Sequence, residues 1–327
     1  MKNVLEWLEA TVAKYPDKPA FSDTESSITF RQVYDIARNT GAYLVEQLGV
    51  DRTPVAVFAG RKMVTPAYFL GVVYAGRPYA PIDASLPDKR IEKILESLCP
   101  GAIVADRESR EHVESIVDEL AKAEGFDRPQ IFIAEDISRF EQVACADSNC
   151  KISESAGDAV TDSENDTDGG VVAGCAGKTD DSSRDMLAVV RRQMSMTDPL
   201  YIIYTSGSTG NPKGVMTSHL SLMTYINAYC DVMHIEESDV LGNQSPLDYI
   251  AAIRDIYLPL KTGCSTAIIP KEYFMEPNAL FDYMNDKKVS SVGWSVSAFT
   301  ILTSLGAFEE VGLKSLRKIC FSGSVMP

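Results

Sequence analysis

Two hydrophobic periods alternate along the first third of the chain. Apolar residues at helical spacing predict helices at residues 4–12, 33–48, 65–75, 87–98 and 113–123. Short apolar runs between them predict strands at residues 55–58, 79–83, 102–105 and 131–133, after a hairpin over residues 20–30. Strands and helices that alternate at this spacing are typical of parallel, doubly wound sheets.

The same alternation returns in the second half of the chain. It predicts strands at residues 200–204, 240–244, 266–269, 289–292 and 318–322. Helices are expected from Met186, from an N-cap at Ser218 to about Cys230, after Pro277 and at residues 298–305. The predicted fold class is therefore α/β, with doubly wound, mostly parallel sheets and flanking helices. Because 327 residues exceed the usual single core, we expect two α/β subdomains, at residues 1–135 and 184–327.

Residues 136–183 have a different composition. They are rich in Asp, Ser, Gly and Ala and contain few large apolar side chains, so they cannot bury a core and are expected to be disordered. Cys145, Cys150 and Cys175 lie in this segment, which raises the alternative of a metal site. No histidine joins them and their spacing fits no standard zinc pattern, so we favour an acidic surface insert and predict no metal site.

The charge balance limits the partners of the chain. Its 46 acidic and 31 basic residues leave a net charge of −15. Nucleic acid and anionic membranes attract basic surfaces, so neither is an expected partner. The seven cysteines include no CxxC pair, and we find no apolar leader or membrane-spanning run, which predicts a cytoplasmic protein with reduced thiols.

The strongest chemical signal is the loop at residues 205–214, which follows the apolar strand at residues 200–204. Its glycines allow the backbone N–H groups to approach an anion, its hydroxyls are donors, and Lys213 supplies a positive charge. It is not a Walker A loop, since Pro212 precedes the lysine and Gly214 follows it, so the chain should not enter a helix there. The candidate nucleotide-binding residues are Thr205, Ser206, Gly207, Ser208, Thr209, Gly210 and Lys213.

A mobile surface turn is the alternative, because Ser, Thr, Gly and Pro are also ordinary turn residues. The full stretch from Tyr201 to Val215, however, resembles the signature of the adenylate-forming (AMP-binding) enzymes, and is most similar to amino-acid adenylation domains of the D-alanine–carrier-protein ligase type. Gly76 to Asp83 matches a second family pattern, Gly-x-x-Tyr-x-Pro-x-Asp. The resemblance implies ATP-dependent activation of a carboxylic or amino acid with Mg²⁺, followed by transfer to a phosphopantetheinyl carrier protein or CoA.

The resemblance also implies an acid-binding segment at residues 246–257. In amino-acid-activating relatives an aspartate there holds the α-ammonium group, and a gapless alignment places Ile250 at that position. Isoleucine cannot pair with a buried ammonium, so ordinary α-amino acids are not the expected best substrates unless Asp248, two residues earlier, holds the ammonium. The implied substrate-binding residues are Tyr249, Ile250, Ala251 and Arg254.

Arg254 has two interpretations. It could bind a second carboxylate of the substrate. Alternatively it faces solvent or pairs with Asp255 or Asp248, and we favour this alternative slightly.

The family's catalytic lysine, its Mg²⁺-binding glutamate and its ribose-binding aspartate match nothing in these 327 residues. The resemblance therefore implies the N-terminal core of the adenylate-forming fold, incomplete at the C-terminus and inactive alone. Either the chain is a fragment or another polypeptide supplies the rest. The alternatives are a non-catalytic or degenerate adenylation-type binding module and, less favoured, an unrelated phosphate-binding α/β protein.

Overall fold

The computed structural model describes residues 2–123, 125–139, 180–206, 211–310 and 312–325. Most of the predicted insert therefore lies outside the described residues. Its two ends are helical, in α6 (Ala134–Ile137) and α7 (Asp180–Gln193). The helix expected from Met186 thus begins at Asp180.

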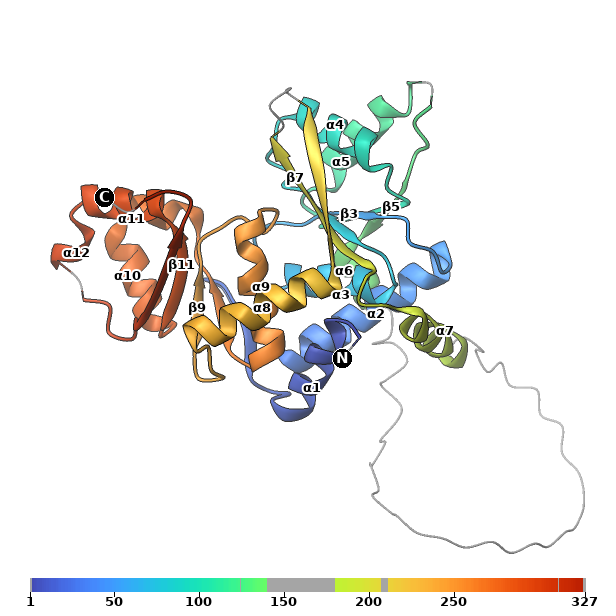
Figure 1. The fold of residues 1–327 in the computed structure, drawn as a ribbon. Helices are drawn as coiled ribbons and strands as arrows, with labels where there is room; N and C mark the ends of the chain where they lie inside the picture. The colour runs from blue at the N-terminus through green and yellow to red at the C-terminus, as the bar shows by residue number, and fades with distance from the viewer. Residues whose placement is uncertain (1, 124, 140–179, 207–210, 311, 326–327) are drawn as a thin grey trace, which may run out of the picture.

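Two six-stranded sheets form the framework of the molecule (Figure 1). Sheet A has the strand order β12-β11-β9-β10-β1-β2, and sheet B has the order β6-β5-β3-β4-β7-β8. Neighbouring strands are parallel except in the pairs β1/β2 and β7/β8. The predicted fold class is confirmed.

The strands of sheet A are β1 (Pro19–Ser22), β2 (Ser27–Thr29), β9 (Val240–Asn243), β10 (Ser265–Ile268), β11 (Ser291–Ser295) and β12 (Lys318–Ser322). Those of sheet B are β3 (Val55–Phe58), β4 (Tyr79–Pro81), β5 (Ala102–Ala105), β6 (Gln130–Ile133), β7 (Pro199–Ser206) and β8 (Pro212–Ser218). Each sheet thus takes strands from both sides of residues 136–183. The division into two subdomains stays a prediction, but the sheets do not follow it.

One strand begins later than predicted. The sequence predicts a strand at residues 289–292, whereas β11 starts at Ser291. Lys288 is left-handed, with φ of 55°, and the Val289 N–H still bonds to the Met284 carbonyl. Val289 therefore completes the end of the preceding helix before the chain becomes extended.

The main helices are α1 (Leu5–Lys14), α2 (Phe30–Leu48), α3 (Thr65–Tyr74), α4 (Asp88–Leu98), α5 (Arg110–Leu120), α8 (His219–Met233), α9 (Ile253–Thr262), α10 (Pro277–Asp286), α11 (Val296–Ser304) and α12 (Ala307–Glu310).

Side chains of a strand alternate between its two faces. On β3, Val55 and Val57 pack toward α1, α2, α3, α8 and α9, whereas Ala56 and Phe58 pack toward α4 and α5. On sheet A, one face packs on α10 and α11, through side chains that include Ala267, Val292 and Trp294. Helices therefore lie between the sheets and on both outer faces.

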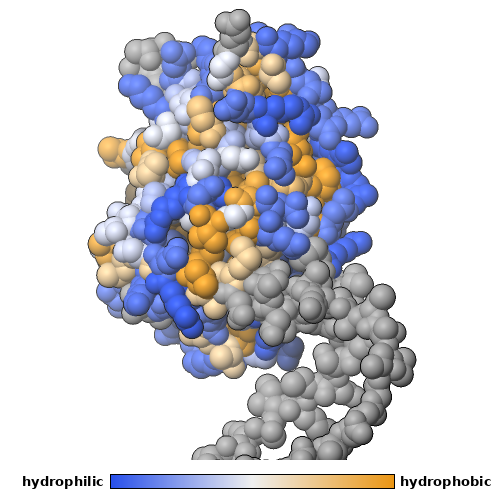
Figure 2. All heavy atoms as spheres, turned by 90° about the vertical axis from the view of Figure 1, so that its right-hand side faces the viewer, coloured by the Kyte–Doolittle hydropathy of each residue, from blue (hydrophilic) through white to orange (hydrophobic). Residues whose placement is uncertain are grey.

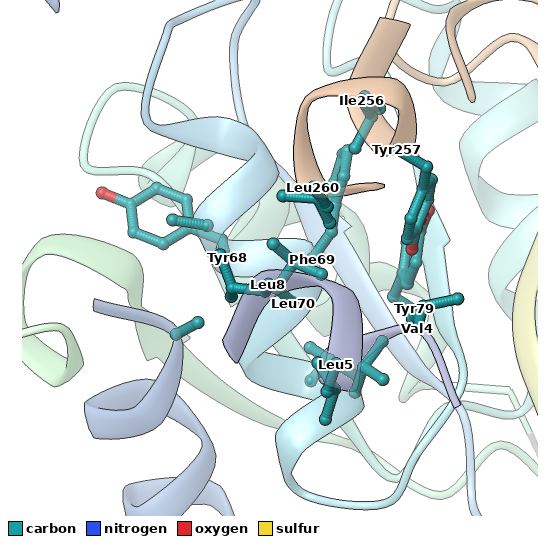
Figure 3. Close-up of a cluster of buried hydrophobic side chains, with 14 of the residues drawn as sticks. Val4, Leu5, Leu8, Tyr68, Phe69, Leu70, Tyr79, Ile256, Tyr257 and Leu260 are labelled. Atoms are coloured by element: carbon teal, nitrogen blue, oxygen red, sulfur yellow. Dashed lines mark hydrogen bonds between the residues drawn. The ribbon is translucent and has the colours of Figure 1, made fainter. Parts of the chain in front are cut away.

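Helix α9 joins the two sheets at the centre of the molecule. Its residues from Ile253 to Leu260 are all buried. The Tyr257 hydroxyl lies 3.2 Å from the hydroxyl of Tyr79 on β4, and the Tyr79 ring stacks on Phe69 of α3 at 4.6 Å (Figure 3). The segment after β9, which carries the predicted acid-binding residues, is held against sheet B by these contacts.

His219 is the first residue of α8. Ser218 caps α8 as expected, with its hydroxyl accepting from the Ser221 N–H, but the adjacent His219 is buried. Its Nδ1 accepts a hydrogen bond from the Val4 N–H at 3.5 Å, which requires a neutral ring. Burial lowers the pKa of His219 to about 4; Arg191 and Arg52 act in the same direction and Asp198 opposes them.

We expect this histidine to make the stability depend on pH. Since its pKa is about 4 in the folded protein and 6.5 ordinarily, the unfolded chain binds more protons between these values. The free energy of unfolding should fall as the pH drops, by about 2 kcal/mol between pH 7 and pH 5. Urea unfolding at both pH values would measure the fall, and a His219→Gln variant should show a smaller one. An equal pH dependence in both proteins would contradict this role.

On the face shown in Figure 2, hydrophilic residues cover most of the surface and hydrophobic groups lie between them. Within the described parts of the chain, no helix has the length and apolar content needed to cross a bilayer.

Candidate functional site

The predicted phosphate loop lies at the tip of the β7/β8 hairpin. Residues 207–210, which include four of the predicted ligands, lie outside the described residues. The hairpin register places Lys213 opposite Thr205 and Pro212 opposite Ser206. Because β8 begins at Pro212, the chain does not enter a helix at the lysine, as predicted. The glycine- and serine-rich tip is therefore shorter than the predicted loop, and strands hold both of its ends.

Lys213 is exposed and forms no ion pair with any residue of the described part of the chain. The Thr205 hydroxyl donates to the Lys213 carbonyl at 3.5 Å, which ties the two strands together beside the tip. A Cβ on Gly214 would lie 2.9 Å from Ile202 and 3.1 Å from the Tyr204 ring. Glycine there lets β8 lie close to β7 next to Lys213.

Lys93 is a second cation at this tip that sequence reasoning missed. It lies on the exposed side of α4, and its Nζ donates to Asn211 Oδ1 at 3.0 Å. The two residues are 118 positions apart, so no local pattern connects them. The tertiary structure therefore places two lysines at the predicted anion site.

The predicted acid-binding residues do not form one group. Tyr249 and Ile250 are 54% and 47% exposed, at the start of the short 3₁₀ helix η2 (Ile250–Ala252), and Ala251 is half-buried. Arg254, one turn further on, is buried. The first three residues lie at the surface, whereas the arginine lies beneath it.

The Arg254 side chain extends along the inner face of sheet A. Its Nε donates to Asp255 Oδ1 at 3.2 Å, and its guanidinium lies 5.8 Å from the centre of the Tyr229 ring. A Cβ on Gly293 would come within 2.4 Å of the Arg254 Cζ. The solvent-facing interpretation is therefore wrong, and pairing with Asp255 is confirmed. Burial lowers the pKa of Arg254, but Asp255 together with Tyr229, Tyr225 and Cys320 outweighs burial, so that the pKa is raised.

Asp255 is itself fixed by a buried network. Asn243 at the end of β9 donates to Asp255 Oδ2 at 3.0 Å, and the Thr266 hydroxyl donates to the Asp255 carbonyl at 2.6 Å. Arg61 donates to both the carbonyl and Oδ1 of Asn243 at 2.9 Å. Because Asn243 and Thr266 hold Asp255 in place, Asp255 in turn fixes the position of Arg254.

A separate cleft of about 600 Å³ opens where strands of both sheets end, a common place for ligands in α/β proteins. Loops after β3, β4, β9 and β10 line it, including Lys62, Asp83, Asp248 and Lys271. Burial and the nearby Asp83 raise the pKa of Asp248. Asp248 thus faces this cleft, and none of the residues predicted from the sequence to bind nucleotide or acid lines it.

The fold and the hairpin together define an α/β protein in which antiparallel strands β7 and β8 flank the predicted phosphate loop. The model of the AMP-binding enzyme family matches residues 8–327, and the chain belongs to this family.

The relatives agree with this membership. The chain is 26% identical to a D-alanine–D-alanyl carrier protein ligase of Bacillus licheniformis over 97% of its own length and 53% of the relative's. A ligase of the same name from Bacillus cereus is 25% identical over 99% and 54%. The chain therefore spans about half the length of the curated relatives it matches.

Solved structures share the fold at low sequence identity. VinN superposes with a TM-score of 0.72 at 16% identity, covering 100% of this chain and 70% of VinN. The inhibitor-bound N-terminal domain of FACL13 from Mycobacterium tuberculosis gives 0.72 at 18% identity, covering 100% and 71%.

The residues at the hairpin fit the phosphates of a nucleotide, because Lys213 and Thr205 lie opposite each other next to its tip and Lys93 contacts Asn211 there. For a bound Mg²⁺ ion, the described residues offer no comparable site. Among the described residues there is no group of three or more His, Cys, Asp or Glu side chains that could hold a metal ion. We therefore assign no described residue to the metal.

Proposed function

We propose that this chain is the nucleotide- and acid-binding part of a cytoplasmic protein that activates a carboxylic acid with ATP and Mg²⁺. In the proposed reaction a carboxylate oxygen attacks the α-phosphorus of ATP, the bond from that phosphorus to the bridging oxygen breaks, and pyrophosphate leaves. The acyl group of the adenylate then passes to the thiol of a phosphopantetheinyl carrier protein or CoA, releasing AMP. The family membership and the carrier-protein ligases among the relatives support this proposal.

The observation that carries the proposal is the position of Lys213. It lies opposite Thr205 at the tip of a hairpin that bears the family signature, exposed and without an acidic partner among the described residues. In the proposed site Thr205, Ser206, residues 207–210 and Lys213 surround the β- and γ-phosphates and stabilise the charge that develops on pyrophosphate. Lys93 would hold the tip through Asn211.

Tyr249, Ile250 and Ala251 would form the wall against which the acid lies. Because the chain spans about half of its relatives, the remaining contacts would come from further residues of the protein or from another polypeptide. The reaction is tested by ATP–pyrophosphate exchange with the complete polypeptide encoded by the gene. A protein that binds ATP but exchanges pyrophosphate with no acid would be a binding module instead.

We expect acids without an α-ammonium group to be better substrates than simple α-amino acids. Ile250 stands where relatives carry the ammonium-binding aspartate, and a buried ammonium without a partner costs several kcal/mol. Exchange with a panel of amino, hydroxy, aryl and aliphatic acids would measure the preference. Ile250→Asp should raise the relative activity with α-amino acids.

Asp248 supplies the control for this experiment, because its carboxylate is two residues from Ile250 in the sequence but faces the separate cleft. Asp248→Asn should leave the acid preference unchanged. Strong wild-type activity with alanine that survives Asp248→Asn would contradict the prediction.

A further inference from the structure

The cleft at the carboxyl ends of the strands is not used by the proposed reaction, because none of the described residues assigned to nucleotide or acid lines it. Its volume of about 600 Å³ falls in the range of small-molecule sites, roughly 300–1,000 Å³. Part of its lining is apolar and comes from Phe69, Ile82, Leu247 and Ile268, whose side chains are otherwise buried. The cleft therefore has the size and the apolar lining to bind a small organic molecule.

One wall of the cleft is fixed by hydrogen bonds to the loop after β3. The Gly60 N–H donates to Asp106 Oδ2 at 2.9 Å, and the Thr65 hydroxyl donates to the Gly60 carbonyl at 2.6 Å. The Met63 N–H donates to Asp23 Oδ2 at 3.1 Å, which ties this loop of sheet B to the β1/β2 turn of sheet A. The wall is thus formed before any ligand binds, as is usual for small-molecule sites.

Carboxylates predominate among the charged side chains that line the cleft. The acidic ones are Asp23, Glu25, Asp83, Glu108, Asp248 and Glu272, and the basic ones are Arg61, Lys62 and Lys271. Lys62 pairs with Glu108 at 2.8 Å, and Arg61 donates to Asn243. Lys271 is exposed and has no ion pair within the described parts of the chain. The charge of the lining therefore favours a cation.

Asp83 and Asp248 bring two of these carboxylates together from different sheets, since Asp83 follows β4 and Asp248 follows β9. Both residues are half-buried. Burial and the nearby Asp83 raise the pKa of Asp248, and the positive charge of Arg90 offsets them only in part. Like charges at close range in a partly buried site repel each other, so a cation bound between them is stabilised. Glu272, on the short 3₁₀ helix η3 (Lys271–Met275), adds an exposed carboxylate to the lining.

We propose that the cleft binds a linear aliphatic diamine, with one ammonium group between Asp83 and Asp248, the methylene chain on the apolar lining and the second ammonium group at Glu272. The charged ends of a diamine pair with carboxylates, and its methylene groups cover apolar side chains that a bare metal ion would leave in water. The described residues also contain no group of three or more His, Cys, Asp or Glu side chains that could hold a metal ion. The diamine contacts neither the phosphate hairpin nor Tyr249–Ala251, so this site is independent of the proposed function.

The test compares cadaverine with pentylamine, which has the same carbon chain but a single ammonium group. Each amine would be titrated by calorimetry into this 327-residue chain at about 0.15 M salt, which screens the general attraction of cations to a net charge of −15. We expect cadaverine to bind about 10-fold more tightly than pentylamine, because a second charged contact forms. Glu272→Gln should remove this difference and leave pentylamine binding unchanged. Asp83→Asn should weaken the binding of both amines about 10-fold.

Two further variants complete the experiment. Lys271→Ala removes the unpaired cation of the cleft and should tighten the binding of both amines. Asp282→Asn is the matched control, because Asp282 is an exposed acid on α10 that does not line the cleft, and it should bind both amines as the wild type does. Thermal unfolding would show that each variant is folded. Because Glu272 is exposed, its replacement tests the site even where Asp83→Asn destabilises the fold.

Equal affinity for cadaverine and pentylamine would overturn the proposal, as would a cadaverine preference that survives in Glu272→Gln. A loss of binding in Asp282→Asn as large as that in Asp83→Asn would also overturn it, because the amines would then respond to the net charge of the protein and not to the cleft.

Discussion

Replacing Lys213 by alanine should slow adenylate formation about a hundredfold, a loss of about 3 kcal/mol in transition-state stabilisation. The lysine lies at the tip of the β7/β8 hairpin, and the described structure gives its ammonium group no acidic partner. Its charge is therefore available for the negative charge that grows on pyrophosphate as the bond to the α-phosphorus breaks. Because that charge is largest in the transition state, the rate should fall more than the affinity for ATP.

The measurement is ATP–pyrophosphate exchange by the complete gene product, with kcat and the KM for ATP determined separately. Lys122→Ala is a matched control, since Lys122 is an exposed lysine outside the hairpin that pairs with Glu119. It should have the wild-type rate. Lys93→Ala should have an intermediate effect, because Lys93 acts on the tip through Asn211. A wild-type rate in Lys213→Ala would remove this hairpin from the proposed mechanism.

Replacing Arg77 by methionine should lower the free energy of unfolding by about 2–4 kcal/mol, because hydrogen bonds to three backbone carbonyls are lost. The Arg77 side chain is 1% exposed and pairs with Asp51. Its guanidinium also donates to the Leu48 carbonyl at 3.1 Å, the Gly49 carbonyl at 3.3 Å and the Thr53 carbonyl at 3.2 Å. These carbonyls belong to the end of α2 and the loop that follows it, where helical partners are missing. Methionine fills the space but leaves all of them without a donor.

Urea unfolding of the 327-residue chain would measure this loss. Arg52→Met provides a matched control, because Arg52 also forms an ion pair, with Asp198, but is 51% exposed. Exposed pairs contribute little, so this variant should lose less than about 1 kcal/mol. Similar losses in the two variants would mean that the buried carbonyl contacts of Arg77 do not stabilise the fold.

Local pattern was enough to predict most elements. The strands predicted at residues 55–58, 102–105 and 318–322 have these bounds in the structure, because short apolar runs between turn residues have few other ways to be buried. The N-cap Ser218 and the C-cap Gly49, with φ of 70°, follow from side-chain and backbone chemistry within one turn of a helix. The family signature at residues 201–215 is likewise contiguous, so the sequence alone indicated the family that the family model confirms.

Strand β8 was missed, because its residues Val215 and Met216 are exposed and leave no apolar run to recognise. Its strand character comes from pairing with β7. The sequence also did not predict that each sheet combines strands from both halves of the chain. β1 pairs with β10 across nearly the whole chain, and no periodicity indicates which distant strand a given strand will join.

The sequence by itself thus determined most of the secondary structure, the fold class and the family signature at the β7/β8 hairpin, all of which depend on neighbours within a few positions. Only the tertiary structure decided the environment of individual polar side chains. It buried His219 against Val4, brought Lys93 to Asn211 and paired the buried Arg254 with Asp255. The physical reason is that burial, pKa and hydrogen-bond satisfaction depend on groups that are distant in sequence and meet only when the helices pack between the sheets.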